Sequence, residues 1–299
     1  MKKFIGTGVA IVTPFNNDYS IDYNSLKVLI NNLIENNVDF LVLLGSTGET
    51  SCISLEEQNS LIEYTIEVVN KRIPIVVGCT FNNTTEGVKR AKQLSNFDID
   101  AILSASPFYN KPSQDGIYNH FKLISQNSKH PIILYNVPGR TCSNILPHTA
   151  VKLYNDCENI VAIKEASGNI NQVMDLINIK DDNFIVLSGE DALNVPLISV
   201  GVQGTISVVA NTYPKLVSNM IKKALEGDFY DASKIHYNLL KVTNLLFAEG
   251  NPAGVKALLS VQNKCNNILR LPLLSVSSNL IEKLKEEDNI LKIIEIEYL

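Results

Sequence analysis

The chain has 299 residues, of which 45% are hydrophobic and 19% charged, and its formal net charge is −5. This length allows a large core, and α/β barrels reach about 250 residues as a single domain. The acidic balance and the lack of a basic stripe argue against nucleic acid as a partner. No apolar run is long enough to span a membrane, so we expect no membrane partner.

Cysteines and histidines argue against disulfides and against a metal site. The five cysteines are odd in number, widely spaced and without a C-x-x-C pair. This usage is typical of reduced thiols, so we expect a cytoplasmic protein. The four histidines form neither H-x-H nor H-E-x-x-H, and each is better explained as a surface or packing residue than as a metal ligand.

Short apolar runs alternate with amphipathic segments through the first two thirds of the chain. Their length and composition predict buried parallel strands over residues 8–13, 40–44, 75–78, 101–104, 132–136, 160–164, 184–188 and 204–207. The segments between them have helical periodicity, as in residues 23–36. The helix predicted for residues 55–70 also begins with a capping box, Ser54 followed by Glu57.

Eight strand–helix units in succession predict a closed (β/α)8 barrel, the TIM barrel fold. The alternative is an open doubly wound sheet, which normally has fewer strands and a G-x-G-x-x-G turn, and the chain has no such turn. After residue 207 the helical pattern continues alone, over residues 213–226, 228–249, 252–261 and 277–291. We therefore predict a catalytic barrel over residues 1–226 and a C-terminal helical domain over residues 227–299.

Lys164 is the most informative candidate, because it ends the apolar run that begins at Asn159. Catalytic groups of barrels lie at the carboxyl ends of the strands. Burial there disfavours the ammonium form, and a neutral amine is a nucleophile toward carbonyl groups. Taken alone, a lysine that extends from the strand end into water explains the pattern better.

The other strand ends add groups of matching chemistry. The segment Gly45-Ser46-Thr47-Gly48-Glu49 offers backbone amides and hydroxyls to an anion, although it is also an ordinary turn. Two prolines stiffen the loop that presents Tyr109, which could equally be an aromatic residue packed under that loop.

Strands five and seven contribute three further candidates. Tyr135 lies at the end of strand five and could transfer protons, and Arg140 could bind a carboxylate in bidentate fashion. Alone, both fit a buried tyrosine and a surface arginine better. Gly189, after strand seven, would allow a ligand to approach the backbone closely. Together, an amine, a phenol, an anion cradle and a guanidinium at one mouth predict a Schiff-base enzyme acting on an α-keto acid.

Three motifs carry a resemblance to a known family: Gly45-Ser46-Thr47-Gly48-Glu49, Tyr135-Asn136-Val137-Pro138-Gly139-Arg140-Thr141 and Ile163-Lys164-Glu165-Ala166-Ser167-Gly168. In this order and spacing the chain resembles the dihydrodipicolinate synthase family, within the N-acetylneuraminate lyase superfamily. The resemblance extends over essentially the whole chain. It implies a (β/α)8 barrel with a C-terminal helical domain, no metal, no cofactor, and usually a homotetramer built as a dimer of tight dimers.

The resemblance also implies roles for individual residues in a condensation of pyruvate with L-aspartate 4-semialdehyde, in lysine and diaminopimelate biosynthesis. Lys164 forms the Schiff base. A proton relay comprises Ser46, Tyr135 and Tyr109, the last reaching in from a neighbouring subunit. The substrate-binding residues are Thr47, whose amide joins that of Ser46 at the pyruvate carboxylate, Arg140, which binds the carboxylate of the semialdehyde, and Gly189 and Ile206.

Two departures from the family pattern give separate expectations. Ser46 replaces the usual threonine, which removes a methyl group that restricts χ1 and leaves the relay less firmly held. Members inhibited by L-lysine share Asn82 and Glu86 with this chain but differ at three other positions. They tend to have histidine where this chain has Leu55, histidine or another polar residue at Gln58, and tyrosine at Phe108. We therefore expect weak or absent inhibition by L-lysine.

Two alternative functions stay open at this point. The first is another pyruvate-dependent aldolase or lyase, such as an N-acetylneuraminate lyase. Those enzymes share the lysine and the tyrosine and can have serine at position 46, whereas Arg140 and the loop 108–113 favour the synthase. The second is a non-catalytic barrel that binds a keto acid. The complete set of four chemical groups and the lack of an added regulatory domain argue against it.

Overall fold

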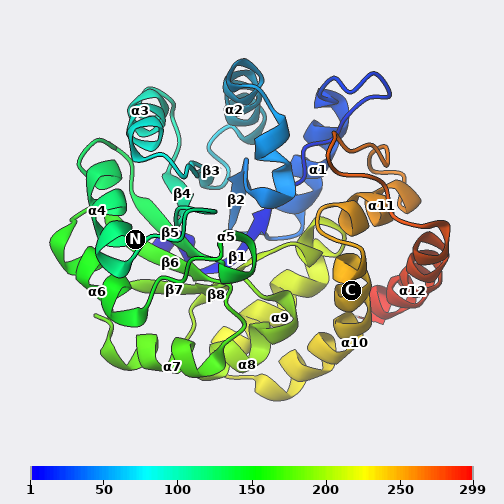
Figure 1. Cartoon of the computed structure of the whole chain (residues 1–299). Coiled ribbons are helices and arrows are strands. Elements are labelled where there is room, and N and C mark those ends of the chain that lie inside the picture. Colours follow the sequence, from blue (N-terminus) through cyan, green and yellow to red (C-terminus); the bar gives the residue numbers. More distant parts are fainter. Residues whose placement is uncertain (1, 298–299) are drawn as a thin grey trace.

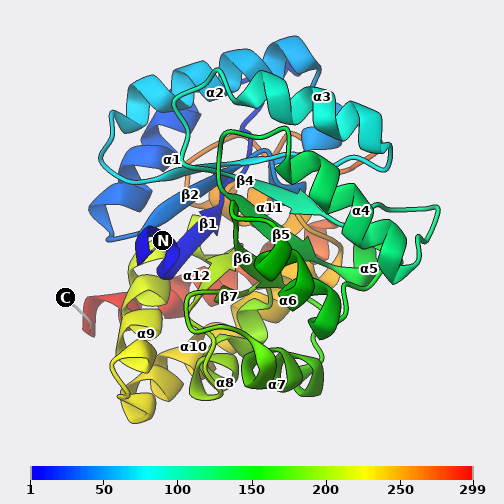
Figure 2. The ribbon, with the colours of Figure 1, turned by 90° about the vertical axis from the view of Figure 1, so that its left-hand side faces the viewer.

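A computed structural model describes residues 2–297 of the chain. Eight strands close into a barrel in chain order, and each pairs in parallel with its neighbours (Figures 1 and 2). The strands are β1 (Gly6–Ala10), β2 (Phe40–Leu43), β3 (Ile75–Gly78), β4 (Ala101–Ala105), β5 (Ile132–Asn136), β6 (Ile160–Glu165), β7 (Ile185–Ser188) and β8 (Gly204–Ser207). The predicted (β/α)8 barrel is therefore confirmed, and the sheet is not open.

The prediction for the first strand, residues 8–13, was wrong by two residues at the start and three at the end. Gly6 pairs with Gly204 on β8, so the strand begins earlier than the apolar run suggests. At the other end the amide of Val12 donates to the side chain of Asn211 instead of to a neighbouring strand. Ile11 and Val12 are buried outside the ladder, so the apolar run continues beyond the strand.

A ring of helices covers the outside of the barrel, with at least one helix after each strand (Figure 2). They are α1 (Tyr23–Glu35), α2 (Leu55–Val69), α3 (Thr84–Leu94), α4 (Gln114–Ser125), α5 (Pro138–Thr141), α6 (Pro147–Asp156), α7 (Ile170–Ile179), α8 (Asn194–Ser199) and α9 (Pro214–Leu225). The predicted capping box at α2 is present in full: Ser54 accepts from the amide of Glu57, and Glu57 accepts from that of Ser54. It satisfies amides that the first helical turn leaves free.

Alternation along the strands divides the core into two parts, because successive side chains point to opposite faces of the sheet. One large cluster fills the space between sheet and helices. A smaller cluster fills the barrel itself, with Phe40, Val42, Ile133 and Tyr135 among its members. Side chains of this inner cluster that lie near the carboxyl ends of the strands therefore face the opening of the barrel at that end.

Three further helices follow the barrel: α10 (Phe229–Ala248), α11 (Ala253–Val261) and α12 (Ser278–Glu297). They gather on one side of the barrel, coloured yellow to red in Figure 1. The predicted domain boundary falls in the turn between α9 and α10, and the division into two domains stays a prediction. Over residues 2–297, none of the helices has the length and apolar character needed to cross a membrane.

Candidate active site

Two connected hollows open at the carboxyl ends of the strands. An inner cavity of about 60 Å³ reaches Lys164, and an outer cleft of about 540 Å³ extends from it toward α2 and α3. The two share lining residues, including Ser46, Tyr135 and Arg140. Another hollow, of about 650 Å³, lies beside the start of β1 and α9, but none of the predicted site residues lines it. The inner cavity and the outer cleft are therefore the candidate active site.

Lys164 lies near the end of β6 with only 5% of its surface exposed. Its register partner on β5 is Tyr135, and the Lys164 Nζ lies 4.5 Å from the centre of the Tyr135 ring. Within residues 2–297 the amine has no hydrogen bond or ion pair, so it is available to a ligand. A Cβ at Gly189 would come within 2.8 Å of Lys164 Cε and 2.5 Å of Ala166 Cβ, so glycine leaves room for the lysine.

Three carboxylates lie near Lys164, two of them buried and the third half-buried, and sequence reasoning gave none of them a role. Glu165 accepts hydrogen bonds from the Asn136 and Gln172 side chains and from the amide of Ser167. Burial raises the pKa of Glu190, and the charge of Asp191 raises it further, while Lys164 opposes both. Burial also raises the pKa of Asp191. The available signal was their position, since Glu165 directly follows the predicted strand 160–164 and the other two come two and three residues after the predicted strand 184–188.

Asp191 fixes the ends of two strands to each other. Its carboxylate accepts from the amides of Val208 and Val209 and from the Ser207 hydroxyl. These bonds lower the pKa of Asp191 and partly offset the effect of burial. They join the segment after β7 to the end of β8, immediately below the inner cavity.

The opposite wall is the short 3-10 helix η2 (Ser46–Gly48), which follows β2. Gly48 and Glu49 donate their amides within this turn, to Gly45 and Ser46. In the part of the chain that the structure describes, the amides of Ser46 and Thr47 have no acceptor, and both residues line the inner cavity. Two free amides at a turn form a concave site for an anion, which is the arrangement predicted for this segment.

Asn251, between α10 and α11, links two of the predicted residues. Its side-chain amide donates to the Thr47 hydroxyl at 2.9 Å. Its backbone carbonyl accepts from the Arg140 guanidinium at 3.4 Å. Arg140 lies on α5 and lines both hollows. Sequence reasoning missed Asn251 because 204 positions separate it from Thr47.

Two of the predicted residues do not reach the inner cavity. The Tyr109 side chain is 87% exposed, on the loop after β4, whereas its neighbour Phe108 lines the outer cleft. Ile206 is buried inside the barrel, and Val208, two residues further along, lines the cavity instead. The roles of Tyr109 and Ile206 stay predictions.

The arrangement can capture a small carbonyl compound covalently. An unpaired amine sits beside a phenol, and two free amides face them across the cavity. Such a site holds a carboxylate at one end of a molecule while an amine adds to a carbonyl at the other. Over residues 2–297 there is no cluster of three or more metal-ligating side chains, and all five cysteines are free.

Comparisons with known proteins agree with this geometry. The profile of the Dihydrodipicolinate synthetase family matches residues 3–292. The chain is 48% identical to the 4-hydroxy-tetrahydrodipicolinate synthase of Azobacteroides pseudotrichonymphae, over 94% of this chain and 95% of that relative.

Two solved structures share the whole fold. The 4-hydroxy-tetrahydrodipicolinate synthase from Methylacidiphilum fumariolicum SolV superposes with a TM-score of 0.95 at 37% identity, covering 99% of each chain. The chloride-inhibited dihydrodipicolinate synthase from Acinetobacter baumannii, complexed with pyruvate, gives 0.92 at 38% identity, covering 95% of this chain and 97% of that one. The chain therefore belongs to the dihydrodipicolinate synthetase family.

Proposed function

We propose that this chain is a Schiff-base lyase that condenses pyruvate with L-aspartate 4-semialdehyde to give 4-hydroxy-tetrahydrodipicolinate, in lysine and diaminopimelate biosynthesis. The observation that carries the proposal is the unpaired Lys164 amine, buried beside Tyr135 and facing the free amides of Ser46 and Thr47. The family relationship supports it, as does the pyruvate complex of the Acinetobacter relative. The chemistry needs only groups that the chain itself supplies.

The first half of the reaction forms the covalent intermediate. The Lys164 amine adds to C2 of pyruvate, whose carboxylate lies on the amides of Ser46 and Thr47. Tyr135 donates a proton to the departing hydroxyl, and loss of water gives the Schiff base. Removal of one proton from the pyruvate methyl group then yields an enamine. The positive charge on the imine nitrogen makes this methyl group acidic enough to lose a proton, because it accepts the electron pair that the C–H bond leaves behind.

The second half joins the two substrates and releases the lysine. The enamine carbon attacks the aldehyde carbon of the semialdehyde, and the new alkoxide takes a proton to become the 4-hydroxyl group. The amine of the semialdehyde then adds to C2 and displaces Lys164, which closes the six-membered ring. Arg140, exposed at the rim, is placed to bind the second carboxylate through its planar guanidinium.

Tyr109 and the assembly form one linked part of the proposal. The tyrosine is almost fully exposed on the single chain, and its backbone is held in a left-handed conformation with φ of 76°. We assign it to the proton relay of a neighbouring subunit in a homotetramer. Ser46 completes that relay, and Ile206 packs behind the bound pyruvate from inside the barrel.

The experiment that tests the function is a coupled assay of pyruvate with L-aspartate 4-semialdehyde, using a dihydrodipicolinate reductase and NADPH. N-acetylmannosamine serves as the comparison aldehyde, because it is what a sialic acid lyase condenses with pyruvate. Turnover of the semialdehyde supports the synthase. Turnover of the sugar alone would contradict it. Inertness toward both, together with failure of borohydride to trap pyruvate on Lys164, would contradict any Schiff-base chemistry.

A further inference from the structure

A fully buried ion pair connects the C-terminal helices to the turn that lines the active site. The Lys256 Nζ on α11 lies 2.5 Å from Glu49 Oε1, and neither side chain has any exposed surface. Glu49 directly follows the 3-10 turn of Ser46 and Thr47. Buried ion pairs are costly to form, since both charges lose their water. Their presence beside an active site therefore calls for a specific explanation.

Other contacts hold both members of the pair in place. Lys256 also donates to the carbonyl of Ile268 at 2.9 Å, and its ammonium lies 4.0 Å from the centre of the Phe15 ring. The second oxygen of Glu49 accepts from the amide of Arg270 at 3.1 Å. The carboxylate is thus anchored at both oxygens to the segment that runs from α11 to α12.

The backbone of Glu49 explains why an anchor matters at this residue. Its φ of 55° and ψ of 35° lie in the left-handed region, which residues with a side chain adopt at a cost. From this position its amide donates to Ser46 and its carbonyl accepts from Cys52. A relaxed Glu49 backbone would rotate the preceding peptides, and with them the amides of Ser46 and Thr47 that line the cavity.

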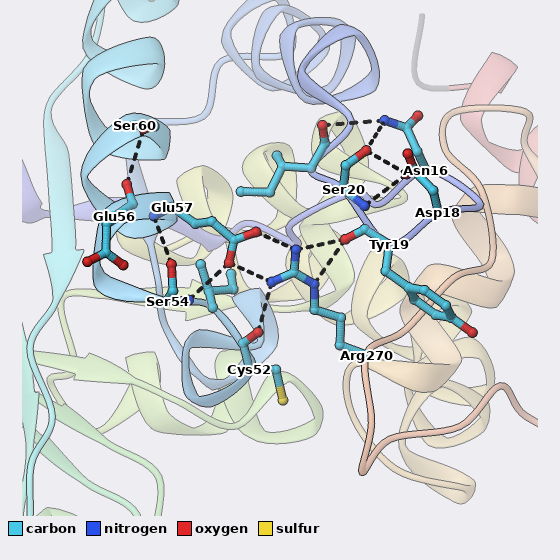
Figure 3. Close-up of polar contacts among 12 residues, drawn as sticks. Asn16, Asp18, Tyr19, Ser20, Cys52, Ser54, Glu56, Glu57, Ser60 and Arg270 are labelled. Atoms are coloured by element: carbon cyan, nitrogen blue, oxygen red, sulfur yellow. Dashed lines mark hydrogen bonds and ion pairs between the residues drawn. The ribbon is translucent and has the colours of Figure 1, made fainter.

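A second contact of the same C-terminal segment lies nearby but avoids this turn. Figure 3 shows the guanidinium of Arg270 between the carboxylate of Glu57 and the carbonyls of Cys52 and Tyr19. These bonds hold the start of α2 and the loop after β1. Glu57 therefore provides a matched comparison, since it also joins the barrel to the C-terminal segment, and among the described residues its side chain bonds Ser54 and Arg270 and not residues 46–48.

We propose that Glu49 and Lys256 are positioning residues, whose buried ion pair lets the C-terminal helices set the orientation of the two amides that receive the substrate carboxylate. This inference rests on the proposed function, because it assigns pyruvate binding to the turn. The pair does not touch substrate. It acts by holding the left-handed residue that ends the turn, so its effect falls on pyruvate affinity more than on the chemical step.

The decisive variant is the double substitution Glu49→Gln with Lys256→Met, which removes both charges and nearly preserves volume. A single Lys256→Met change would leave the Glu49 charge buried and unpaired, which endangers folding. We expect the apparent KM for pyruvate to rise about tenfold or more, since a displacement of about 1 Å within a site can cost about 10²-fold. The kcat per active site, with the sites counted by borohydride trapping, should fall by a smaller factor than the KM rises, because Lys164 and Tyr135 keep their places and only Ser46 of the relay moves with the turn.

Glu49→Asp is the second variant, in case the double variant does not fold. It keeps the charge but shortens the side chain by one methylene group, so the turn must shift to keep the pair. We expect a smaller rise in the pyruvate KM in the same direction. Glu57→Gln is the control, expected to lower the thermal midpoint while leaving the pyruvate KM unchanged.

Failure of this inference is distinguishable from failure of the proposed function. An inert wild-type enzyme would overturn the function. An active wild type whose double variant keeps its pyruvate KM would overturn the positioning role alone. An equal rise of KM in Glu57→Gln would also overturn it, since it would show a general effect of loosening the C-terminal segment.

Discussion

The active site has two halves that the protein holds in different ways. The strand half comprises Tyr135 and Lys164, at the ends of β5 and β6. The turn half comprises Ser46 and Thr47, in the 3-10 turn after β2. The strand half is fixed by ladder register and by a buried polar network between the sheet and α7. The turn half is fixed by two side chains and one backbone amide of the C-terminal segment.

Register alone places much of the strand half. Tyr135 pairs with Lys164, and the next pair along the two strands, Asn136 and Glu165, is joined by a side-chain hydrogen bond of 2.9 Å. Asn136 also donates to Asn144, so the network reaches the loop that follows α5. These contacts link β5 and β6. Tyr135 and Lys164 are therefore held in a fixed position relative to each other.

The turn half depends on residues far along the chain. Thr47 is bonded to Asn251, and Glu49 is paired with Lys256. The difference teaches that the covalent step rests on contacts between neighbouring strands, whereas carboxylate binding rests on contacts between residues about 200 positions apart. Substitutions should therefore divide into those that abolish chemistry and those that weaken binding.

The largest effect is expected for Lys164→Ala. Removal of the nucleophile should reduce kcat/KM by at least ~10⁴-fold, as loss of a covalent group does in other enzymes. Mass spectrometry after borohydride treatment with pyruvate should show no added mass, and circular dichroism should show a retained fold. Lys152→Ala, at an exposed position on α6, serves as the control. An active Lys164→Ala enzyme would contradict the role of Lys164 as the Schiff-base nucleophile.

Arg140→Ala is expected to affect one substrate more than the other. The guanidinium lies at the rim, beyond both halves, so the apparent KM for the semialdehyde should rise about 10- to 100-fold, the loss of a charge-assisted pair. The KM for pyruvate should change much less. Arg140→Lys retains the charge without the bidentate geometry, so its KM for the semialdehyde should lie between those of the wild type and Arg140→Ala. Equal effects on both substrates would count against this assignment.

The sequence predicted the strand half better than the turn half, and the reason is physical. Apolar runs and their terminal residues are local signals, so Lys164 and Tyr135 could be placed at a common mouth from their positions alone. The eight strands were recovered for the same reason. Only β1 was displaced, because Ile11 and Val12 are buried without being in the ladder.

Long-range partners left no such local signal. Asn251 and Lys256 act through side-chain contacts whose partners are set by packing, and nothing in the spacing of the residues indicates them. Gly189 was expected to admit a ligand, whereas the structure shows that it also makes room for Lys164. Tyr109 lies outside the cavity of the single chain, so its role depends on an assembly that one sequence does not describe.

Glu165→Gln tests whether the buried polar network around Glu165 stabilises the fold. The amide keeps the shape but loses an acceptor oxygen and the charge. Either the Ser167 amide loses its acceptor, or the Asn136 and Gln172 side chains, which share one oxygen, both lose theirs. We expect the free energy of unfolding to fall by about 1–3 kcal/mol. Glu158→Gln, an exposed position before the same strand, should change it by less than about 0.5 kcal/mol. Similar losses in both variants would contradict the comparison.

Acid titration of stability probes the other contact of the C-terminal segment, between Arg270 and Glu57 on α2. The hydrogen bonds from Arg270 hold the pKa of Glu57 at about 2, below its ordinary value of 4.5, against the opposing effect of burial. A carboxyl whose pKa is lower in the folded state stabilises the protein above its unfolded pKa. That stabilisation is lost as the pH falls from about 4.5 to about 2.

Chemical denaturation at a series of pH values should show this loss in the wild type and not in Glu57→Gln. The difference between the two proteins should be about 1 kcal/mol or less above pH 5, since the pair is partly exposed and screened by solvent. It should shrink toward pH 2. A difference that stays constant across this window would mean that the Arg270 contact does not depend on the charge of Glu57.

The smallest effect is expected for added L-lysine, which tests the outer cleft beside the turn half. The outer cleft passes Leu55, Gln58 and Phe108. Leu55 offers no polar group, and the Gln58 amide already donates to the carbonyls of Thr50 and Ile53. At Leu55 and Gln58, an ammonium and a carboxylate would therefore lose water without gaining a charged partner. Steady-state rates should stay unchanged at low lysine concentrations, whereas Leu55→His should increase sensitivity by restoring one donor. Half-inhibition of the wild type at low lysine would show that the outer cleft recognises lysine through other groups, and that the turn half is open to control from its outer side.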